Sequence, residues 1–222
     1  MPTSTFFRLD QDKQTKILNA AKEEFTKVPL EEASIANIVK SAEIPRGSFY
    51  QYFSGKEDVF YYLFEQIRKE PEETFIRFLE ETKGDLFQAF NYFFIDFSKE
   101  VLEGENQDFF KNIFLHMNYT RTSQMMMTEM TEEERQAHEE HIKRHQGSDD
   151  NYQKIIDLID KDKLTIASPR EFNMLFHQLW SMLFHTINEG YRMRRLTGKI
   201  DFDVLKEDYY LRISWLQHGV AK

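Results

Sequence analysis

Apolar residues recur three and four positions apart along almost the whole chain, and few segments alternate as a β-strand would. Residues 11–26 illustrate the pattern, because Ile17, Leu18, Ala21 and Phe25 fall on one side of a helix. The same spacing, interrupted by Gly, Pro and Ser, predicts further helices over roughly 72–82, 85–102, 106–121, 124–144, 150–161, 169–195 and 201–217. The chain is therefore expected to be all-α.

Shorter elements precede these helices. Ser34 is expected to cap a short helix, and Pro45 suits the first turn of the next one. Ser54, with Glu57 three residues later, predicts a capping box for a longer helix, which Pro71 should end near residue 70. We therefore expect three parts, namely a three-helix N-terminal domain, a connecting helix and a larger helical domain, over residues 1–56, 57–71 and 72–222.

Composition narrows the class of protein. The 222 residues are 41% hydrophobic and 30% charged, as in ordinary globular proteins, and contain no cysteine, which excludes disulfides and thiolate chemistry. No apolar run approaches the roughly 20 residues needed to span a bilayer, and the N-terminus lacks the features of a signal peptide. A cytoplasmic protein without a membrane partner is expected.

Charge is distributed unevenly along the chain. The formal net charge of -9 argues against indiscriminate binding to nucleic acid. Residues 1–56, however, hold eight Lys/Arg against seven Asp/Glu, or +1, which leaves -10 for the remainder. Residues 34–56 contain three basic residues and one acidic residue, which gives a net charge of +2. The sequence thus predicts a small positive patch on an acidic protein.

That patch contains the segment "IPRGSFYQYFSGKEDVF", residues 44–60. A short helix, a tight turn and a second short helix, braced by an earlier helix, is the layout of a helix-turn-helix, whose second helix enters the major groove of DNA. Packing in the interior would explain Phe49 and Phe53, but it would not explain Arg46, Gln51 and Lys56 among them. The pattern favours DNA binding over an aromatic packing turn.

Each exposed position of this segment suits a DNA contact. Arg46 can form a bidentate contact with guanine, and Gly47, without a Cβ, lets the backbone approach DNA closely. Ser48 and Gln51 can read base edges. The hydroxyls of Tyr50 and Tyr52 and the ammonium of Lys56 can contact phosphates.

The longer stretch "SIANIVKSAEIPRGSFYQYFSGKEDVF" resembles the DNA-binding signature of the TetR family of bacterial repressors. The chain departs from the family pattern at Ala33, where Thr is frequent, at Pro29, where Gly is frequent, and at Tyr52, where His is frequent. With Ser34 as the capping hydroxyl, the resemblance implies DNA-binding residues at Ser34, Asn37, Pro45, Arg46, Gly47, Ser48, Tyr50, Gln51, Tyr52 and Lys56.

The resemblance also implies a C-terminal domain that dimerises and binds a small molecule, which lowers the affinity for DNA. Such a homodimer should read a palindromic operator in double-stranded DNA, since one helix-turn-helix covers a half-site. The family's last two helices match residues 169–195 and 201–217. Their candidate interface residues are Leu175, Leu179, Met182, Leu183, Ile187, Leu205, Leu211, Ile213 and Trp215.

Phe and Met are concentrated in the predicted C-terminal helices, since the chain has 21 Phe and nine Met. Such stripes can be plain core or can line an adaptable cavity for a lipophilic or aromatic effector. A single residue of such a stripe is usually core, but the cluster taken together favours the cavity. No basic residue is placed for a carboxylate or phosphate of the ligand. The candidate ligand-binding residues are Phe90, Phe94, Phe97, Phe110, Phe114, Met117, His177, Trp180 and Phe184.

The remaining histidines leave alternatives open. His138, His141 and His145 share one helix face and could hold a metal, but their highly charged surroundings favour a solvated helix. His177 and His185 could supply a polar group to a pocket or be satisfied in the interior. We expect no metal and no cofactor.

Two other functions compete with a DNA-binding regulator. The chain has no GxSxG, HExxH, Walker or Rossmann motif, so we expect no catalytic residues and no enzyme activity. A helical protein-interaction module without DNA binding remains the alternative, and it predicts that substitution of Arg46 changes nothing.

Overall fold

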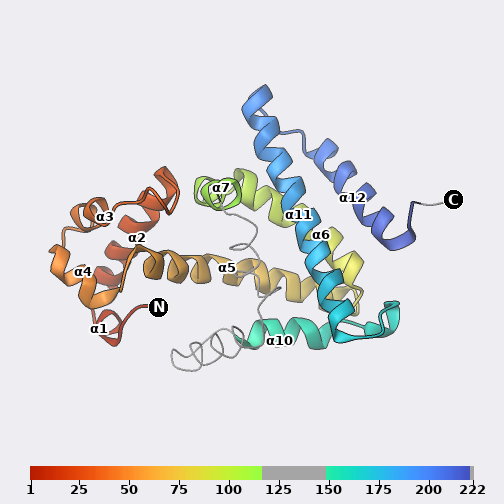
Figure 1. The fold of residues 1–222 in the computed structure, drawn as a ribbon, viewed down its shortest axis with the longest axis horizontal. Coiled ribbons are helices and arrows are strands. Elements are labelled where there is room, and N and C mark those ends of the chain that lie inside the picture. The colour runs from red at the N-terminus through yellow and green to blue at the C-terminus, as the bar shows by residue number, and fades with distance from the viewer. Residues whose placement is uncertain (117–148, 221–222) are drawn as a thin grey trace. The chain divides into compact units, whose positions relative to one another are not determined.

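The computed structural model describes residues 1–116 and 149–220, and these residues form helices and no strand (Figure 1). The all-α prediction is therefore confirmed for the described part of the chain. Contacts divide the chain into two compact units. Unit 1 comprises Met1–Glu70 and Asn106–His116, and unit 2 comprises Pro71–Glu105 and Met117–Lys222.

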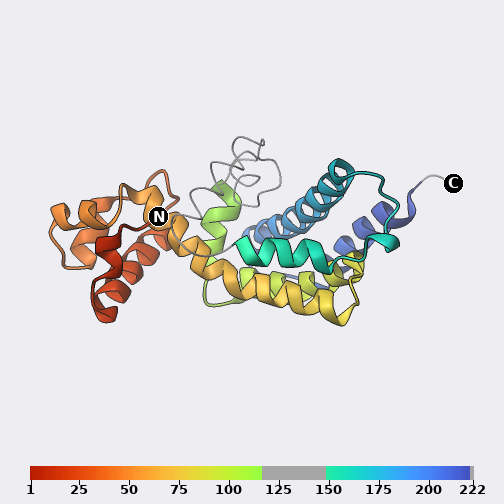
Figure 2. The same cartoon turned by 90° about the horizontal axis from the view of Figure 1, so that it is seen from below.

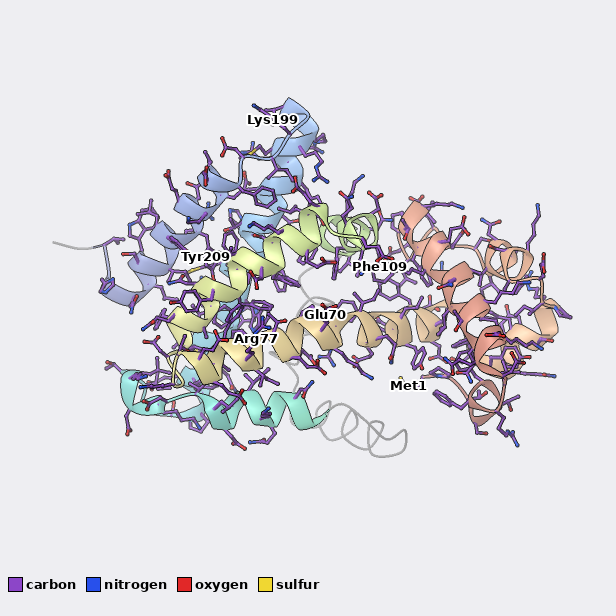
Figure 3. All side chains as sticks on the ribbon, turned by 180° about the vertical axis from the view of Figure 1, so that it is seen from behind. Met1, Glu70, Arg77, Phe109, Lys199 and Tyr209 are labelled. Atoms are coloured by element: carbon purple, nitrogen blue, oxygen red, sulfur yellow. The ribbon has the colours of Figure 1, made fainter. Side chains whose placement is uncertain are left out.

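Unit 1 surrounds an aromatic core. Its helices are α1 (Ser4–Phe7), α2 (Gln11–Lys27), α3 (Ile35–Ser41), α4 (Arg46–Tyr52), the first part of α5 (Lys56–Glu81) and α7 (Gln107–His116). Phe25 and Phe60 meet edge to face in the core, and the ring of Phe109, labelled in Figure 3, lies 5.8 Å from that of Phe60. The side-chain amide of Asn112 donates to the carbonyls of Phe25 and Thr26, which fastens α7 to the end of α2.

Unit 2 is built from long helices that pack against one another. It contains the second part of α5, α6 (Leu86–Glu103), α10 (Asp149–Leu158), the 3₁₀ turn η1 (Lys161–Lys163), α11 (Pro169–Thr197) and α12 (Phe202–His218). Helix α11 packs against both α6 and α12. The hydroxyl of Tyr191 donates to the carbonyl of Val101 at 2.9 Å, and Tyr209 (Figure 3) stacks on Phe94 with ring centroids 3.9 Å apart.

Side-chain caps explain where the helices of unit 2 begin. Asp85, Ser168 and Asp201 each accept a hydrogen bond from the backbone N–H three residues later, at the starts of α6, α11 and α12. Helix α10 lies alongside the second part of α5 (Figure 2), where Lys154 pairs with Glu80 at 3.3 Å. Of the aromatic residues singled out as ligand candidates, Phe90, Phe94 and Phe97 lie on α6, and Trp180 and Phe184 lie on α11.

Two expectations about secondary structure are wrong, and one short helix was not expected. Helix α5 continues through Pro71 to Glu81, so no separate helix occupies residues 72–82. A proline inside a helix costs one backbone hydrogen bond, and burial of Phe75 and Leu79 in the next turns offsets that cost. The sequence also gave no sign of α1, which at four residues is too short to show a period.

The predicted caps of α3 and α5 form differently. Ser34 occupies the N-cap position of α3, but its side chain makes no capping hydrogen bond. Ser54 pairs with Asp58 instead of Glu57, through its backbone N–H at 2.8 Å and its hydroxyl at 2.6 Å. In both places a carboxylate accepts from the serine's backbone N–H. Glu24 of α2 accepts from Ser34, and Asp58 in the first turn of α5 accepts from Ser54.

The two units are defined by packing contacts and do not coincide with the three functional parts predicted over residues 1–56, 57–71 and 72–222. That functional division stays a prediction. The boundary between units falls within α5, between Glu70 and Pro71, and α7 is grouped with the N-terminal elements. Within the described residues, no helix is long and apolar enough to cross a membrane.

Candidate nucleic-acid interface

Helix α4 separates its side chains into a buried and an exposed side. Phe49 is fully buried, and Phe53, directly after the helix, is buried beside it. Arg46, Tyr50 and Gln51 are exposed, and the exposed fraction of Tyr50 reaches 48%. Arg46, Tyr50 and Gln51, three of the residues expected to contact DNA, thus face outward, while Phe49 and Phe53 fasten the helix to the core.

The first turn of α4 is open to a partner. The guanidinium of Arg46 lies 3.4 Å from the hydroxyl of Tyr50 and 6.0 Å from the centre of its ring, which aligns the arginine along the helix surface. A Cβ added to Gly47 would meet no atom within 4 Å. The packing of this chain therefore gives no reason for a glycine here, whereas close approach of another molecule would. Pro45 is the exposed N-cap residue and Ser48 is half-buried.

A buried carboxylate supports α3 from behind. Glu24, on α2, is buried and accepts from the backbone N–H of Ser34 at 2.8 Å. It also accepts from the side-chain amide of Asn37 at 3.0 Å and 3.2 Å. Sequence reasoning missed Glu24, although a signal was present: it lies three residues after Ala21 and seven after Ile17, on the apolar side of the helix.

Lys56 is engaged within the chain. Its ammonium donates to the carbonyl of Glu31 at 2.7 Å and to that of Ala33 at 3.1 Å. These bonds tie the loop before α3 to the start of α5. Lys56 was predicted for a phosphate contact alone, and this second role was not foreseen.

The two tyrosines of α4 have different environments. We expected both to project from the helix, and this is wrong for Tyr52, of which only 5% is exposed. The ring of Phe6 lies against that of Tyr52, with centroids 6.3 Å apart, and fills the space beside it. The phosphate contact assigned to Tyr52 stays a prediction.

Unit 2 gathers most of the predicted ligand residues around one tryptophan. Trp180, half-buried on α11, lies within 6.1 Å of five aromatic rings, those of Phe75, Phe90, Phe93, Phe176 and Phe184. Phe97 stacks on Phe93 at 4.9 Å and so adjoins this cluster. His177 is half-buried, one helical turn before Trp180 on the same helix.

Other predicted ligand and metal residues lie elsewhere. Phe94 stacks on Tyr209 of α12 and not on Trp180. Phe110 and Phe114 lie on α7 in unit 1, and their rings are 6.3 Å apart. Met117, His138, His141 and His145 fall outside the described residues, and residues 1–116 and 149–220 contain no cluster of three metal-binding side chains.

The nine candidate dimer residues differ in exposure: Leu175 and Met182 are half-buried, and the other seven form two groups. Five are buried in unit 2 and belong to the core of the single chain, namely Leu179, Leu183, Ile187, Leu205 and Ile213. Leu211 and Trp215 are about half exposed, at 49% and 50%. Of these two groups, only Leu211 and Trp215 are exposed enough to contact a partner molecule.

Comparisons with solved structures agree with this fold. A TetR family transcriptional regulator from Chloroflexus aurantiacus J-10-FL is 19% identical, with 99% of this chain and 98% of that one covered and a TM-score of 0.50. NalD, the secondary repressor of the MexAB-OprM multidrug efflux pump in Pseudomonas aeruginosa, is 20% identical over 96% and 98%, with a TM-score of 0.56. FadR from Bacillus subtilis, in complex with stearoyl-CoA, is 20% identical over 93% and 99%, with a TM-score of 0.51.

Family models match both parts of the chain, whereas no curated protein sequence matches it. Residues 17–63 match the model for bacterial regulatory proteins of the tetR family. Residues 85–220 match the model for the tetracyclin repressor-like C-terminal domain. The chain therefore belongs to the TetR family of transcriptional regulators, as its helix-turn-helix sequence predicted.

Proposed function

We propose that this protein is a repressor that binds a palindromic operator as a homodimer and leaves it when a lipophilic or aromatic effector binds. The observation that carries the proposal is the outward face of α4. There Arg46, Tyr50 and Gln51 are exposed on a helix whose opposite side is fixed by Phe49. Each part of the proposal rests on a different region of the chain.

For DNA, the exposed residues supply the chemistry of major-groove reading. A guanidinium can donate to O6 and N7 of guanine, and an exposed amide such as that of Gln51 can pair with adenine. The open surface at Gly47 lets the backbone of the first turn come close to the bases. The supports from Glu24 and Lys56 hold the preceding helix and loop in place.

For the homodimer, α12 presents an apolar stripe. Val204, Leu211 and Trp215 lie seven and four residues apart, which places them on one helix face, and all three are large and exposed. Buried in a symmetric interface, such a stripe would lose its contact with water. Substitution of Leu211 by Glu should shift the protein to monomers in sedimentation, and with it weaken operator binding.

For the effector, the aromatic cluster around Trp180 supplies an adaptable apolar surface. Phe90 and Phe93 come from α6 and Trp180 and Phe184 from α11, so a ligand held between them would bear on both helices. The FadR structure, which carries stearoyl-CoA, shares this fold. A long-chain acyl compound is therefore a sensible first probe, beside planar aromatic compounds.

The test of DNA reading begins with selection of genomic fragments by the purified protein. We expect an enriched palindrome, with log K falling linearly with log salt. Arg46→Ala should then weaken operator binding about 5- to 150-fold, the equivalent of ~1–3 kcal/mol. Arg46→Lys keeps the positive charge but loses the planar guanidinium that donates two parallel hydrogen bonds. It should therefore retain non-specific binding but lose much of the specificity.

Arg77, an exposed cation of α5 in unit 2, provides the matched control, and Arg77→Ala should bind the operator like the wild type. Wild-type affinity for Arg46→Ala would remove Arg46 from the interface. No enriched sequence in any salt would favour the interaction module without DNA binding.

The effector is tested separately by fluorescence. The chain has two tryptophans, Trp180 and Trp215, so a Trp215→Phe variant reports on Trp180 alone once its dimeric state is verified. A ligand of the proposed class should change the Trp180 emission and release the operator at the same concentrations. Release without any change at Trp180 would place the effector elsewhere.

A further inference from the structure

The first residues of the described chain hold the end of helix α4. The backbone N–H of Thr3 donates to the carbonyl of Tyr52 at 2.8 Å, and its hydroxyl donates to the carbonyl of Gln51 at 2.6 Å. The last carbonyls of any helix have no partner within that helix. Thr3 thus caps the C-terminal end of α4 from a segment that lies about fifty residues earlier in the chain.

An aromatic side chain reinforces this contact. Phe6, on α1, is fully buried, and its ring lies 5.0 Å from that of Phe53 and 6.0 Å from that of Tyr62. It also covers Tyr52, which explains why this tyrosine is buried. Figure 1 shows α1 beside α4, in agreement with their packing contacts.

The contact leaves the outward face of α4 free. Thr3 bonds backbone carbonyls at the end of the helix, and Phe6 packs on its buried side. Arg46 and Tyr50 remain exposed. The segment therefore supports the helix without covering the residues expected to meet DNA, which argues against an autoinhibitory role.

This support lies outside the region shared with the family's DNA-binding model, which begins at residue 17. We propose that Thr3 and Phe6 are positioning residues for DNA reading, which hold α4 in the pose that fits the major groove. The inference rests on the proposed function. An α4 that spends less time in this pose should bind its operator more weakly, in proportion to the population lost.

Two pairs of variants test the proposal. Thr3 has φ -74°, which proline adopts without strain, so Thr3→Pro removes both donors while keeping the backbone path. Its control is Ser4→Ala, at the neighbouring exposed position. Phe6→Ala removes the buried ring, and Phe7→Ala removes its neighbour, of which 49% is exposed.

Operator affinity is measured at 25 °C, where circular dichroism must show every variant fully folded. We expect Thr3→Pro and Phe6→Ala to weaken binding to the selected palindrome by up to about tenfold, with little change on unrelated DNA. Ser4→Ala and Phe7→Ala should stay near the wild type. If the segment merely stabilised unit 1, Thr3→Pro and Phe6→Ala would lower the melting temperature. The ratio of operator affinity to affinity for unrelated DNA would then stay at its wild-type value.

Hydrogen exchange provides a readout that needs no DNA. Thr3→Pro should speed amide exchange over residues 46–53 and leave α11 and α12 unchanged. Wild-type operator affinity and wild-type exchange in Thr3→Pro and Phe6→Ala would overturn the positioning role, with the proposed function intact. If the wild-type protein selects no DNA while the variants exchange faster, the proposed function is overturned. The role of Thr3 and Phe6 in DNA reading then falls with it, and only their restraint of α4 remains.

Discussion

The side-chain amide of Asn37 lies 3.0 Å and 3.2 Å from the two carboxylate oxygens of Glu24, so the first turn of α3 is anchored to α2 by a buried acid. The same carboxylate accepts from the backbone N–H of Ser34. A serine at this position ordinarily caps the helix through its own hydroxyl. Here the Ser34 side chain makes no capping bond, and the start of α3 is held instead through the backbone N–H of Ser34 and the side-chain amide of Asn37, which both donate to Glu24.

Glu24→Leu should therefore destabilise the protein. The substitution leaves the N–H of Ser34 and the amide of Asn37 without their acceptor, at a cost of about 2–3 kcal/mol in the free energy of unfolding. Urea titration measures this. The neighbouring Glu23 is exposed, and Glu23→Leu should change stability by no more than about 0.5 kcal/mol. Equal effects at the two positions would contradict a special role for Glu24.

Lys56→Met should weaken unit 1 even in the absence of DNA. The substitution keeps the aliphatic chain but removes the ammonium that donates to Glu31 and Ala33. Hydrogen bonds from a charged donor in a partly exposed site suggest a loss of about 1–2 kcal/mol in urea titration. Lys40→Met, on the exposed side of α3, is the control. A Lys56→Met protein as stable as the wild type, but deficient in DNA binding, would leave Lys56 with the phosphate role alone.

Gly190→Ala should strain the contact of α11 with its neighbours. An added Cβ would lie 2.7 Å from a methyl carbon of Leu102 and 3.1 Å from one of Leu205, and both leucines are buried. Overpacking of this kind costs about 1–3 kcal/mol, and the better helix propensity of alanine returns up to about 1 kcal/mol. Thermal unfolding should show a net loss, and Leu102→Val in the same background should recover part of it. A stabilised Gly190→Ala protein would show that the leucines can move aside freely.

The lowered pKa of Asp58 should make the stability of the protein depend on pH. Burial alone would raise the pKa of its carboxyl, but hydrogen bonds from the Ser54 hydroxyl, the amino group of Met1 and the Ser54 backbone N–H lower the pKa overall. A lowered folded pKa stabilises the protein above the unfolded value of about 4, and the stabilisation disappears as the pH falls through the folded value. The stability gap between wild type and Asp58→Asn should thus be constant between about pH 5 and pH 7 and shrink below about pH 4. If the stability difference between wild type and Asp58→Asn stayed the same in stronger acid, packing and not the charge of Asp58 would explain it.

Much of the fold follows from local patterns in the sequence. The three-and-four spacing predicted α2, α6, α11 and α12 to within a residue or two, because each buries one continuous apolar face. Pro45 marked the start of the short helix α4, because its fixed φ suits the beginning of a helix. The exposed Arg46, Tyr50 and Gln51 could be chosen in advance because a polar residue among apolar ones on a short helix faces solvent.

The other features depend on residues distant along the chain. Tyr50 and Tyr52 are the same amino acid two positions apart, yet Phe6 buries only the second. Helix α5 passes through Pro71 because buried side chains beyond it offset one lost hydrogen bond. Glu24 holds the start of α3 across ten residues, and Thr3 caps the end of α4 across about fifty. Propensity and period act between near neighbours, whereas burial and the choice of hydrogen-bond partner are set when remote segments pack together.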